Sequence, residues 1–286
     1  MNLQMMSAAN TLNQLQKKVD IISNNIANVN TTGYKRNEAT FQDLLTQNIK
    51  NQPHAVKEAG RETPYGLRVG FGARIGQTTM RYEQGVPQAT GRDLDFMIEG
   101  EGFWFRTART WVDETGNARR EEYFTRNGSF HLQPTSQQAN APLRLVTHTG
   151  LPVLNNNGQE IRIPANMNHI EMQSDGTLRA VDQSTGEAMN IQLGIAKINR
   201  HDLLEAVGEG QFRLTVNQAQ LVADGGVVLN PNQGSYGLKQ GVLEMSNVDL
   251  TQEMTELMVA QRLMQFQSRA ISMADDMMGL ANSIRG

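Results

Sequence analysis

Apolar residues at heptad spacing mark both ends of this chain, and no such pattern runs through its middle. At each end, apolar positions recur at alternating intervals of three and four residues. This period places each set on one stripe of an α-helix, as in the seam of a coiled coil. Such a chain is suited to join its two ends, to join copies of itself, or both. The stripes consist of Met5, Ala8, Leu12, Leu15, Val19, Ile22, Ile26 and Val29, and of Val259, Leu263, Phe266, Ala270, Met273, Met277, Leu280 and Ile284.

The C-terminal helix, expected over residues 250–284, carries a second apolar stripe that repeats every seven residues. The two stripes are offset by about 200° around the helix axis, so they lie on nearly opposite faces. A helix that is apolar on two opposite faces must be covered on both. A central helix of an ordinary core would meet that need, but this helix is terminal and only one other long amphipathic helix is expected. Further copies of the chain are therefore the expected partners. The second stripe consists of Leu250, Leu257, Met264, Ile271 and Met278.

We expect the stripes of both helices to form an assembly interface. The C-terminal helix, with two stripes, should be the more enclosed of the two. The interface residues predicted in this way are Leu12, Leu15, Val19, Ile22, Ile26, Val29, Leu250, Leu257, Val259, Leu263, Met264, Phe266, Ile271, Met273, Met277, Leu280 and Ile284.

From residue 67 onward, short strand-like runs alternate with turn signals such as the Asn-Gly pairs at 127–128 and 157–158, which are typical of tight hairpins. A short helix is expected around Phe41, and a polar extended loop should follow it. The sequence thus predicts an α+β fold, in which N- and C-terminal helices paired as a coiled coil flank a mostly antiparallel β middle domain. The expected domains are 1–35 (N-terminal helix), 36–93 (connecting region with an extended loop and a β-hairpin), 94–225 (β domain), 226–248 (return β segment) and 249–286 (C-terminal helix).

Charge and cysteine content narrow the class of protein. The net charge of −3 provides no basic field to attract nucleic acid. The chain contains no cysteine, which excludes a disulfide scaffold and a thiolate metal site. No stretch approaches the roughly 20 apolar residues of a transmembrane segment, and the N-terminal region lacks the features of a cleaved signal peptide.

The sequence gives only weak signals for catalytic or ligand-binding residues. The carboxylate pairs Asp93/Asp95 and Glu99/Glu101 could be imagined as acid–base pairs for glycoside cleavage, and Trp104 and Trp111 as a sugar platform. A secreted β-rich enzyme or carbohydrate-binding protein that uses Asp95 and Trp104 is therefore an alternative. Solvated carboxylates and a β core are the more common explanation, and we expect no cofactor and no metal. The histidines, which show no spacing suited to metal ligation, are His54, His131, His148, His169 and His201.

Two segments that border the terminal helices resemble the flagellar basal-body rod and hook protein family. Residues 23–36 read SNNIANVNTTGYKR, and residues 241–250 read GVLEMSNVDL. Central blocks at 90–95 (TGRDLD), 100–103 (GEGF) and 124–128 (FTRNG) resemble the same family. The motif residues that carry the resemblance are Asn24, Asn25, Ala27, Asn28, Gly33, Tyr34, Lys35, Ser246, Asn247, Val248 and Asp249.

Within that family the chain looks most like the distal rod protein. Its length of 286 residues resembles that of the distal rod type or of its proximal relative with one β domain. The polar stretch at 51–65, followed by Gly66-Leu67-Arg68-Val69-Gly70, resembles the extra loop that marks the distal rod protein. One departure is Leu263-Met264 after Ala260-Gln261-Arg262, where the family usually has Ala-Tyr. A proximal rod or hook-type axial protein is the alternative within the family.

The resemblance implies a structural subunit and not an enzyme. Such subunits assemble helically into a tubular drive shaft that transmits motor torque and conducts exported subunits. The implied partners are copies of the same chain, neighbouring rod and hook proteins and the flagellar type III export apparatus. The implied location is the basal body outside the cytoplasmic membrane, reached without a cleaved signal peptide.

Overall fold

The computed structural model describes residues 3–43, 46–49, 67–70, 72–112, 116–136, 141–167, 169–173, 177–182, 186–215, 221–222, 224–231 and 234–285. The chain divides into two compact units. The first contains residues 1–27, 37–81 and 249–286, and the second contains residues 28–36 and 82–248.

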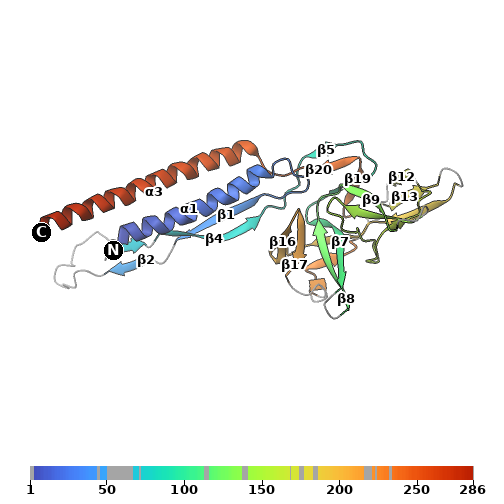
Figure 1. The fold of residues 1–286 in the computed structure, drawn as a ribbon, viewed down its shortest axis with the longest axis horizontal. Coiled ribbons are helices and arrows are strands. Elements are labelled where there is room, and N and C mark those ends of the chain that lie inside the picture. The colour runs from blue at the N-terminus through green and yellow to red at the C-terminus, as the bar shows by residue number, and fades with distance from the viewer. Residues whose placement is uncertain are drawn as a thin grey trace. The chain divides into compact units, whose positions relative to one another are not determined.

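Two long helices dominate the first unit, α1 (Leu3–Ala27) and α3 (Leu250–Arg285). They lie side by side and run in opposite directions (Figure 1). The antiparallel direction follows from two contacts, because Lys18 approaches Glu256 whereas Asn25, later in α1, reaches Glu253, earlier in α3. The two helices predicted from the heptad spacing are therefore confirmed.

The side chain of Asp249 caps the N-terminus of α3. The Asp249 carboxylate accepts the backbone N–H groups of Thr251 at 2.8 Å and Gln252 at 3.3 Å. These are two of the N–H groups that a helix leaves without an internal partner. Glu253, in the first turn, adds negative charge at the positive end of the helix dipole.

A β-ribbon completes the first unit and contacts α1. Strand β1 (Asn37–Asp43) pairs antiparallel with β4 (Ala73–Met80), and β2 (Thr46–Ile49) pairs antiparallel with β3 (Leu67–Gly70). The ribbon is tied to the helix by the backbone N–H of Ile75, which donates to Gln14 Oε1 at 3.0 Å.

The predicted short helix around Phe41 is wrong. Phe41 lies in β1, opposite Ile75 and directly after a bulge in the ladder. The reason is tertiary, because β4 pairs with this segment from Asn37 to Asp43 and Thr40 and Phe41 both suit a strand. Leu44, Leu45 and the predicted extended loop at 51–65 lie outside the described residues.

The second unit consists of antiparallel sheets. The largest has the strand order β16-β17-β8-β7-β15-β18 and contains the antiparallel pair β7–β8. The mostly antiparallel β middle is therefore confirmed. The strands of this sheet are β7 (Phe103–Val112), β8 (Ala118–Thr125), β15 (Ile195–Ile198), β16 (Leu204–Gly208), β17 (Gln211–Leu214) and β18 (Val227–Leu229), with the short 3-10 helix η2 (His201–Leu203) before β16.

Two three-stranded sheets and two strand pairs make up the rest of this unit, with orders β11-β10-β9, β12-β13-β14, β19-β6 and β20-β5. The Asn-Gly pair at 157–158 forms a tight turn, in which Gly158 N–H donates to Asn155 O at 2.9 Å. The pair at 127–128 instead links β8 to β9, which belong to different sheets, so no hairpin forms there. The strands are β5 (Pro87–Ala89), β6 (Phe96–Glu99), β9 (Phe130–Pro134), β10 (Leu143–Thr147), β11 (Arg162–Ile163), β12 (His169–Met172), β13 (Thr177–Val181), β14 (Ala188–Gln192), β19 (Gly237–Gln240) and β20 (Val242–Glu244).

The core of the second unit forms between these sheets and is rich in aromatic side chains. Phe96, Phe105 and Phe130 are fully buried, with the Phe105 and Phe130 rings in an edge-to-face contact at 5.1 Å. Trp104 is also buried and packs edge-on against Phe212 at 4.9 Å. A sugar platform that includes Trp104 is therefore excluded, and the β-core interpretation is confirmed for Trp104, whereas Trp111 is 41% exposed.

Candidate assembly surface and motif network

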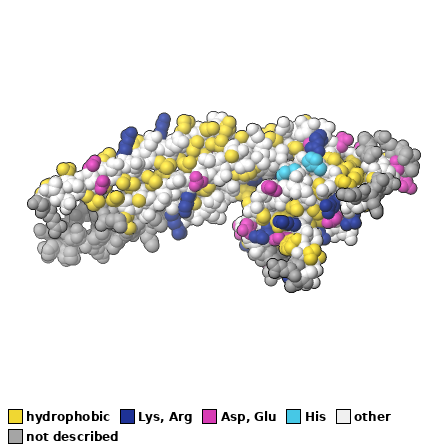
Figure 2. All heavy atoms as spheres, in the orientation of Figure 1, with side chains coloured by type: hydrophobic (Ala, Val, Ile, Leu, Met, Phe, Trp, Pro, Cys, Tyr) yellow, Lys and Arg dark blue, Asp and Glu magenta, His cyan; other side chains and the backbone are white. Residues whose placement is uncertain are grey.

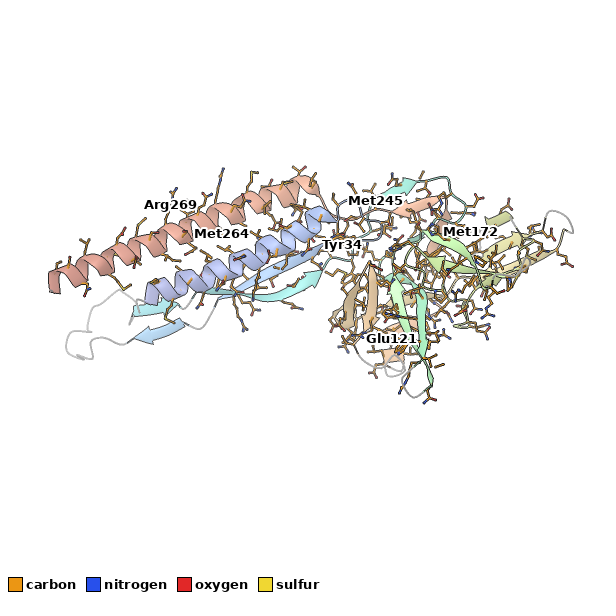
Figure 3. The ribbon with its side chains drawn as sticks, viewed as in Figure 1. Tyr34, Glu121, Met172, Met245, Met264 and Arg269 are labelled. Atoms are coloured by element: carbon orange, nitrogen blue, oxygen red, sulfur yellow. The ribbon has the colours of Figure 1, made fainter. Side chains whose placement is uncertain are left out.

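One face of α3 packs within the first unit. Glu253, Ala260 and Ala274 are at most 3% exposed, and Leu257, Met264 and Ile271 of the seven-residue stripe are half-buried. Figure 3 shows Met264 on the side of α3 that faces α1, and Arg269 on the opposite side. Small residues at 260 and 274 let the helices approach closely. The seven-residue stripe thus packs inside a single chain through its middle, whereas its end residues Leu250 and Met278 are 43% and 37% exposed.

The matching face of α1 is the stripe predicted from its spacing. Ala8, Leu15 and Ile22 are buried, and none of the other members is exposed. The remaining stripe residues on α1, all half-buried, are Met5, Leu12, Val19 and Ile26. Val29, the last residue of the predicted stripe, is half-buried but lies beyond Ala27, where α1 ends. Two polar contacts border this packing, from Lys18 Nζ to Glu256 Oε2 at 3.4 Å and from Asn25 Nδ2 to Glu253 Oε2 at 3.1 Å.

The other stripe of α3 is exposed to solvent. Figure 2 shows hydrophobic side chains spread along the surface of these helices. Soluble chains rarely leave a contiguous apolar surface of this kind uncovered unless it binds a partner. We call these side chains the exposed stripe: Val259 (50% exposed), Leu263 (45%), Phe266 (64%), Met273 (61%), Met277 (55%), Leu280 (64%) and Ile284 (86%), together with the smaller Ala270.

Asn25 of the N-terminal motif joins three elements of the first unit. Its side-chain amide donates to the Asn37 carbonyl at 2.8 Å and accepts the Asn37 N–H at 3.0 Å, which fixes the start of β1. It also donates to Glu253 in the first turn of α3. Asn25 and Glu253 are each 1% exposed, so these bonds satisfy polar groups that have no access to water.

In the second unit the two family motifs meet at a buried carboxylate. Glu244 is 2% exposed, and its Oε1 accepts from Lys35 Nζ at 2.6 Å and from the Gly85 N–H at 2.9 Å. Its Oε2 accepts from Arg126 Nε at 2.6 Å. Lys35 and Arg126 are each 3% exposed. We call Lys35, Glu244 and Arg126 the buried triad.

The triad places two cations beside one carboxylate, and both cations also donate to backbone carbonyls. Lys35 Nζ donates to Glu83 O at 2.7 Å, and the Arg126 guanidinium donates to the carbonyls of Ile98, Gly100 and Phe103. Burial lowers the pKa of Lys35, against the opposing effect of the Glu244 charge. Such a site is costly to break, because removing one partner leaves an uncompensated buried charge.

Further motif residues surround the triad. The Gly33 N–H donates to Glu244 O at 2.8 Å. Asn247 accepts the Arg36 N–H at 2.7 Å and donates to Glu83 O at 3.1 Å. Residues from the two ends of the sequence are thereby fixed in one place, next to β6, β7 and β8 of the sheets. The other motif residues are half-buried Asn28 and Tyr34, buried Ser246 and Val248, and exposed Asn24, Ala27 and Asp249.

Glu244 and Arg126 were not predicted as site residues. Both lie inside sequence blocks that carry the family resemblance, but a single charged residue in a strand or loop is normally solvated. The one available signal was that Glu244, at the end of the short strand β20, stands between the apolar residues Leu243 and Met245. Its burial depends on partners from distant parts of the chain.

The alternative catalytic residues have structural roles. Asp95 is 1% exposed, accepts a hydrogen bond from Thr90 Oγ1 at 2.7 Å and lies 3.3 Å from Arg92. His201 stacks on Tyr82 with ring centroids 3.7 Å apart, and burial lowers its pKa. His54 lies outside the described residues. Among the described residues there is no cluster of acidic and histidine side chains suited to a metal ion, and neither helix is long and apolar enough to cross a membrane.

Three family models match the chain in the order expected from its architecture. Residues 5–35 match "Flagella basal body rod protein", residues 97–180 match "Flagellar hook protein FlgE/F/G D1 domain", and residues 239–284 match "Flagellar basal body rod FlgEFG protein C-terminal". The first match includes Lys35, and the third includes Glu244.

Several relatives are similar over nearly the whole chain. The flagellar hook-basal body complex protein FlhP of Bacillus subtilis is 37% identical over 283 residues, which is 98% of each chain. The flagellar basal-body rod protein FlgG of the same species is 35% identical and covers 95% of each chain. The FlgG protein of Borreliella burgdorferi is 32% identical and covers 98% of this chain and 97% of its own.

Proposed function

The chain belongs to the family of flagellar basal-body rod proteins, and from this membership we propose how its surfaces serve that structure. It is a structural subunit of the basal-body rod, of the distal rod type, and it is not an enzyme. It belongs to the flagellar basal body, where neighbouring rod and hook proteins are its partners.

Copies of the chain assemble helically into a tube through their terminal helices. The observation that carries this proposal is the exposed stripe of α3, in which seven large apolar side chains are between 45% and 86% exposed. Covering such side chains stabilises an assembly by about 25 cal/mol for each Å² of apolar area removed from water. A second copy of the chain is the occupant that fits, because a heptad-spaced stripe is complementary to another heptad-spaced helix.

Within this assembly α1 and α3 form a coiled-coil layer, and α3 is the more enclosed helix. The supporting observation is an asymmetry between the helices. The apolar stripe of α1 is already covered within one chain, whereas α3 has one stripe packed and a second one exposed. Enclosure of α3 by neighbouring copies would remove the second stripe from water. A tube built from many such seams would transmit motor torque and leave a channel for exported subunits.

The buried triad has a different role in this proposal. It fixes residues 33–36, which follow α1, and residues 244–247, which precede α3, in the same polar core of the second unit. Both segments that lead to the assembling helices are therefore anchored, and load on the helices is carried into folded β-structure. The family membership further supports export through the flagellar type III apparatus without a cleaved signal peptide, to a position outside the cytoplasmic membrane.

Replacing one side chain of the exposed stripe tests the proposal. Phe266→Asp places a charge in the interface between copies and is expected to abolish assembly of the purified chain, observed by sedimentation and electron microscopy, and to abolish swimming in cells. Gln265→Asp, on an exposed position off the stripe, is the matched control and should assemble normally. Fluorescence of Trp104 checks that the second unit stays folded. Normal assembly of Phe266→Asp would contradict the proposal.

A further inference from the structure

Methionine is the most abundant side chain on the exposed surface of α3. The sequence contains 15 methionines and no cysteine, so methionine sulfur is the main target that this chain offers to a peroxide. Five methionines of α3 are at least partly open to solvent: Met254 (43% exposed), Met258 (53%), Met273 (61%), Met277 (55%) and Met278 (37%). By contrast, Met97 and Met167 in the second unit are 3% and 7% exposed.

We infer that Met273 and Met277 form an oxidation site that controls assembly: a peroxide converts them to sulfoxides in the free chain, and the oxidised chain no longer assembles. This inference rests on the proposed role of the exposed stripe. The two residues are one helical turn apart on that stripe, between Phe266 and Leu280, so both sulfur atoms would be covered when a second copy binds.

The chemistry is a two-electron oxidation of each thioether. The sulfur lone pair attacks one peroxide oxygen, an S–O bond forms, the O–O bond breaks, and the other oxygen leaves as water after proton transfer. Sulfur is oxidised and the peroxide is reduced, with hydrogen peroxide as the only co-reactant. The product places a strong hydrogen-bond acceptor where the thioether was apolar. Methionine sulfoxide reductases reverse the reaction, so the change can act as a switch.

Position on the helix distinguishes these two methionines from their neighbours. Met254 and Met258 are similarly exposed, but they lie roughly 90° to 130° around the axis from the exposed stripe. Their oxidation changes a face that the proposed interface does not use. In an apolar interface the sulfoxide oxygens at 273 and 277 would be buried without donors, and this opposes burial.

The test compares the full-length chain before and after treatment with hydrogen peroxide. Peptide mass spectrometry should show Met273 and Met277 oxidised at least about tenfold faster than Met97 and Met167 in the free chain, and protected in assembled material. The oxidised chain should need at least about a tenfold higher concentration to assemble, and treatment with methionine sulfoxide reductases should restore assembly.

Three double variants locate the effect. M273L/M277L, which conserves volume, should assemble normally and stay competent after peroxide treatment. M254L/M258L should lose assembly after peroxide treatment as the natural chain does. M273Q/M277Q introduces polar groups without an oxidant and should reproduce the loss of assembly. This variant provides the test if M273L/M277L assembles poorly.

The outcomes separate this inference from the proposed function. Failure of the untreated natural chain to assemble would contradict the proposed function itself. Normal assembly of a chain that carries sulfoxides at 273 and 277 would overturn the oxidation site and leave the proposed function intact. The site would also be overturned if M273L/M277L remained sensitive to peroxide, or if assembly left the two methionines as reactive as in the free chain.

Discussion

Lys35 Nζ lies 2.6 Å from Glu244 Oε1, and this contact joins residues that are 209 positions apart in the sequence. Lys35 follows the N-terminal helix and Glu244 precedes the C-terminal one. Arg126, from the β region between them, completes the site through Glu244 Oε2. The two most recognisable motifs of the family thus meet in the structure as a buried electrostatic network, which explains why lysine and glutamate occur at these positions.

Glu244→Gln is expected to destabilise the second unit strongly. The substitution leaves two buried cations without a counter-charge, and breaking a buried ion pair in this way typically costs about 3–5 kcal/mol. Urea unfolding followed by tryptophan fluorescence measures the loss, because both tryptophans lie in β7. Glu205→Gln is the matched control, since Glu205 is 51% exposed in its pair with Arg213 and its loss should matter far less. Equal effects of the two substitutions would show that the triad carries no special weight.

Acidification should destabilise the second unit through His201. Burial lowers the pKa of His201 below 6.5 in the folded chain, while Asp202 and Glu101 oppose this effect. The folded state therefore binds fewer protons at this site than the unfolded state. The contribution of His201 to the free energy of unfolding is fully present above pH 6.5. It is lost as the pH falls from 6.5 toward the lowered pKa.

His201→Phe isolates this effect, because phenylalanine keeps the stacking on Tyr82 but cannot titrate. Relative to the variant, the natural chain should lose unfolding free energy as the pH is lowered from about 7 to about 5. Urea unfolding at a series of pH values measures it. Parallel pH profiles for the two proteins would refute the assignment.

Gly33→Ala should be more damaging than an alanine substitution at another glycine with the same backbone conformation. Gly33 has φ +71°, and an added Cβ would lie 2.6 Å from the Asn127 backbone nitrogen. Gly116 has φ +78° and open space around its Cβ position. Gly116→Ala therefore carries only the backbone strain of about 1–2 kcal/mol.

The comparison cancels the strain that the two positions share and leaves the steric effect. We expect the midpoint of urea unfolding to fall further for Gly33→Ala than for Gly116→Ala, and the Lys35 segment to show faster amide hydrogen exchange. Equal midpoints would mean that the approach of residue 33 to Asn127 has no energetic importance.

The terminal helices could be predicted because their signal is local. Regular heptad spacing at each end of the chain predicted both helices. The strands at Phe103, Leu143 and Val227 were likewise predictable from short apolar runs between turns. β1 was not, because Phe41 becomes part of a strand only when β4 is beside it.

The spacing could not tell which stripe of α3 packs against α1. Both stripes have the same period, and the choice depends on side-chain volume. Ala260 and Ala274 lie on the packed face and allow close approach, whereas bulky Phe266 and Leu280 are left outside. The triad was not predictable either, because no local pattern shows that Arg126 and Glu244 are buried together.

In the proposed rod, neighbouring copies cover the exposed stripe of α3, and the absence of natural cysteine allows a direct measurement of this burial. Phe266→Cys introduces a single thiol at a position that is 64% exposed in the isolated chain, and Arg162→Cys introduces one on the second unit as the control for reagent access. We expect a maleimide reagent to label both variants as free chains, and to label the control but not Phe266→Cys in assembled rods. Equal labelling of Phe266→Cys before and after assembly would show that neighbouring copies do not cover the exposed stripe.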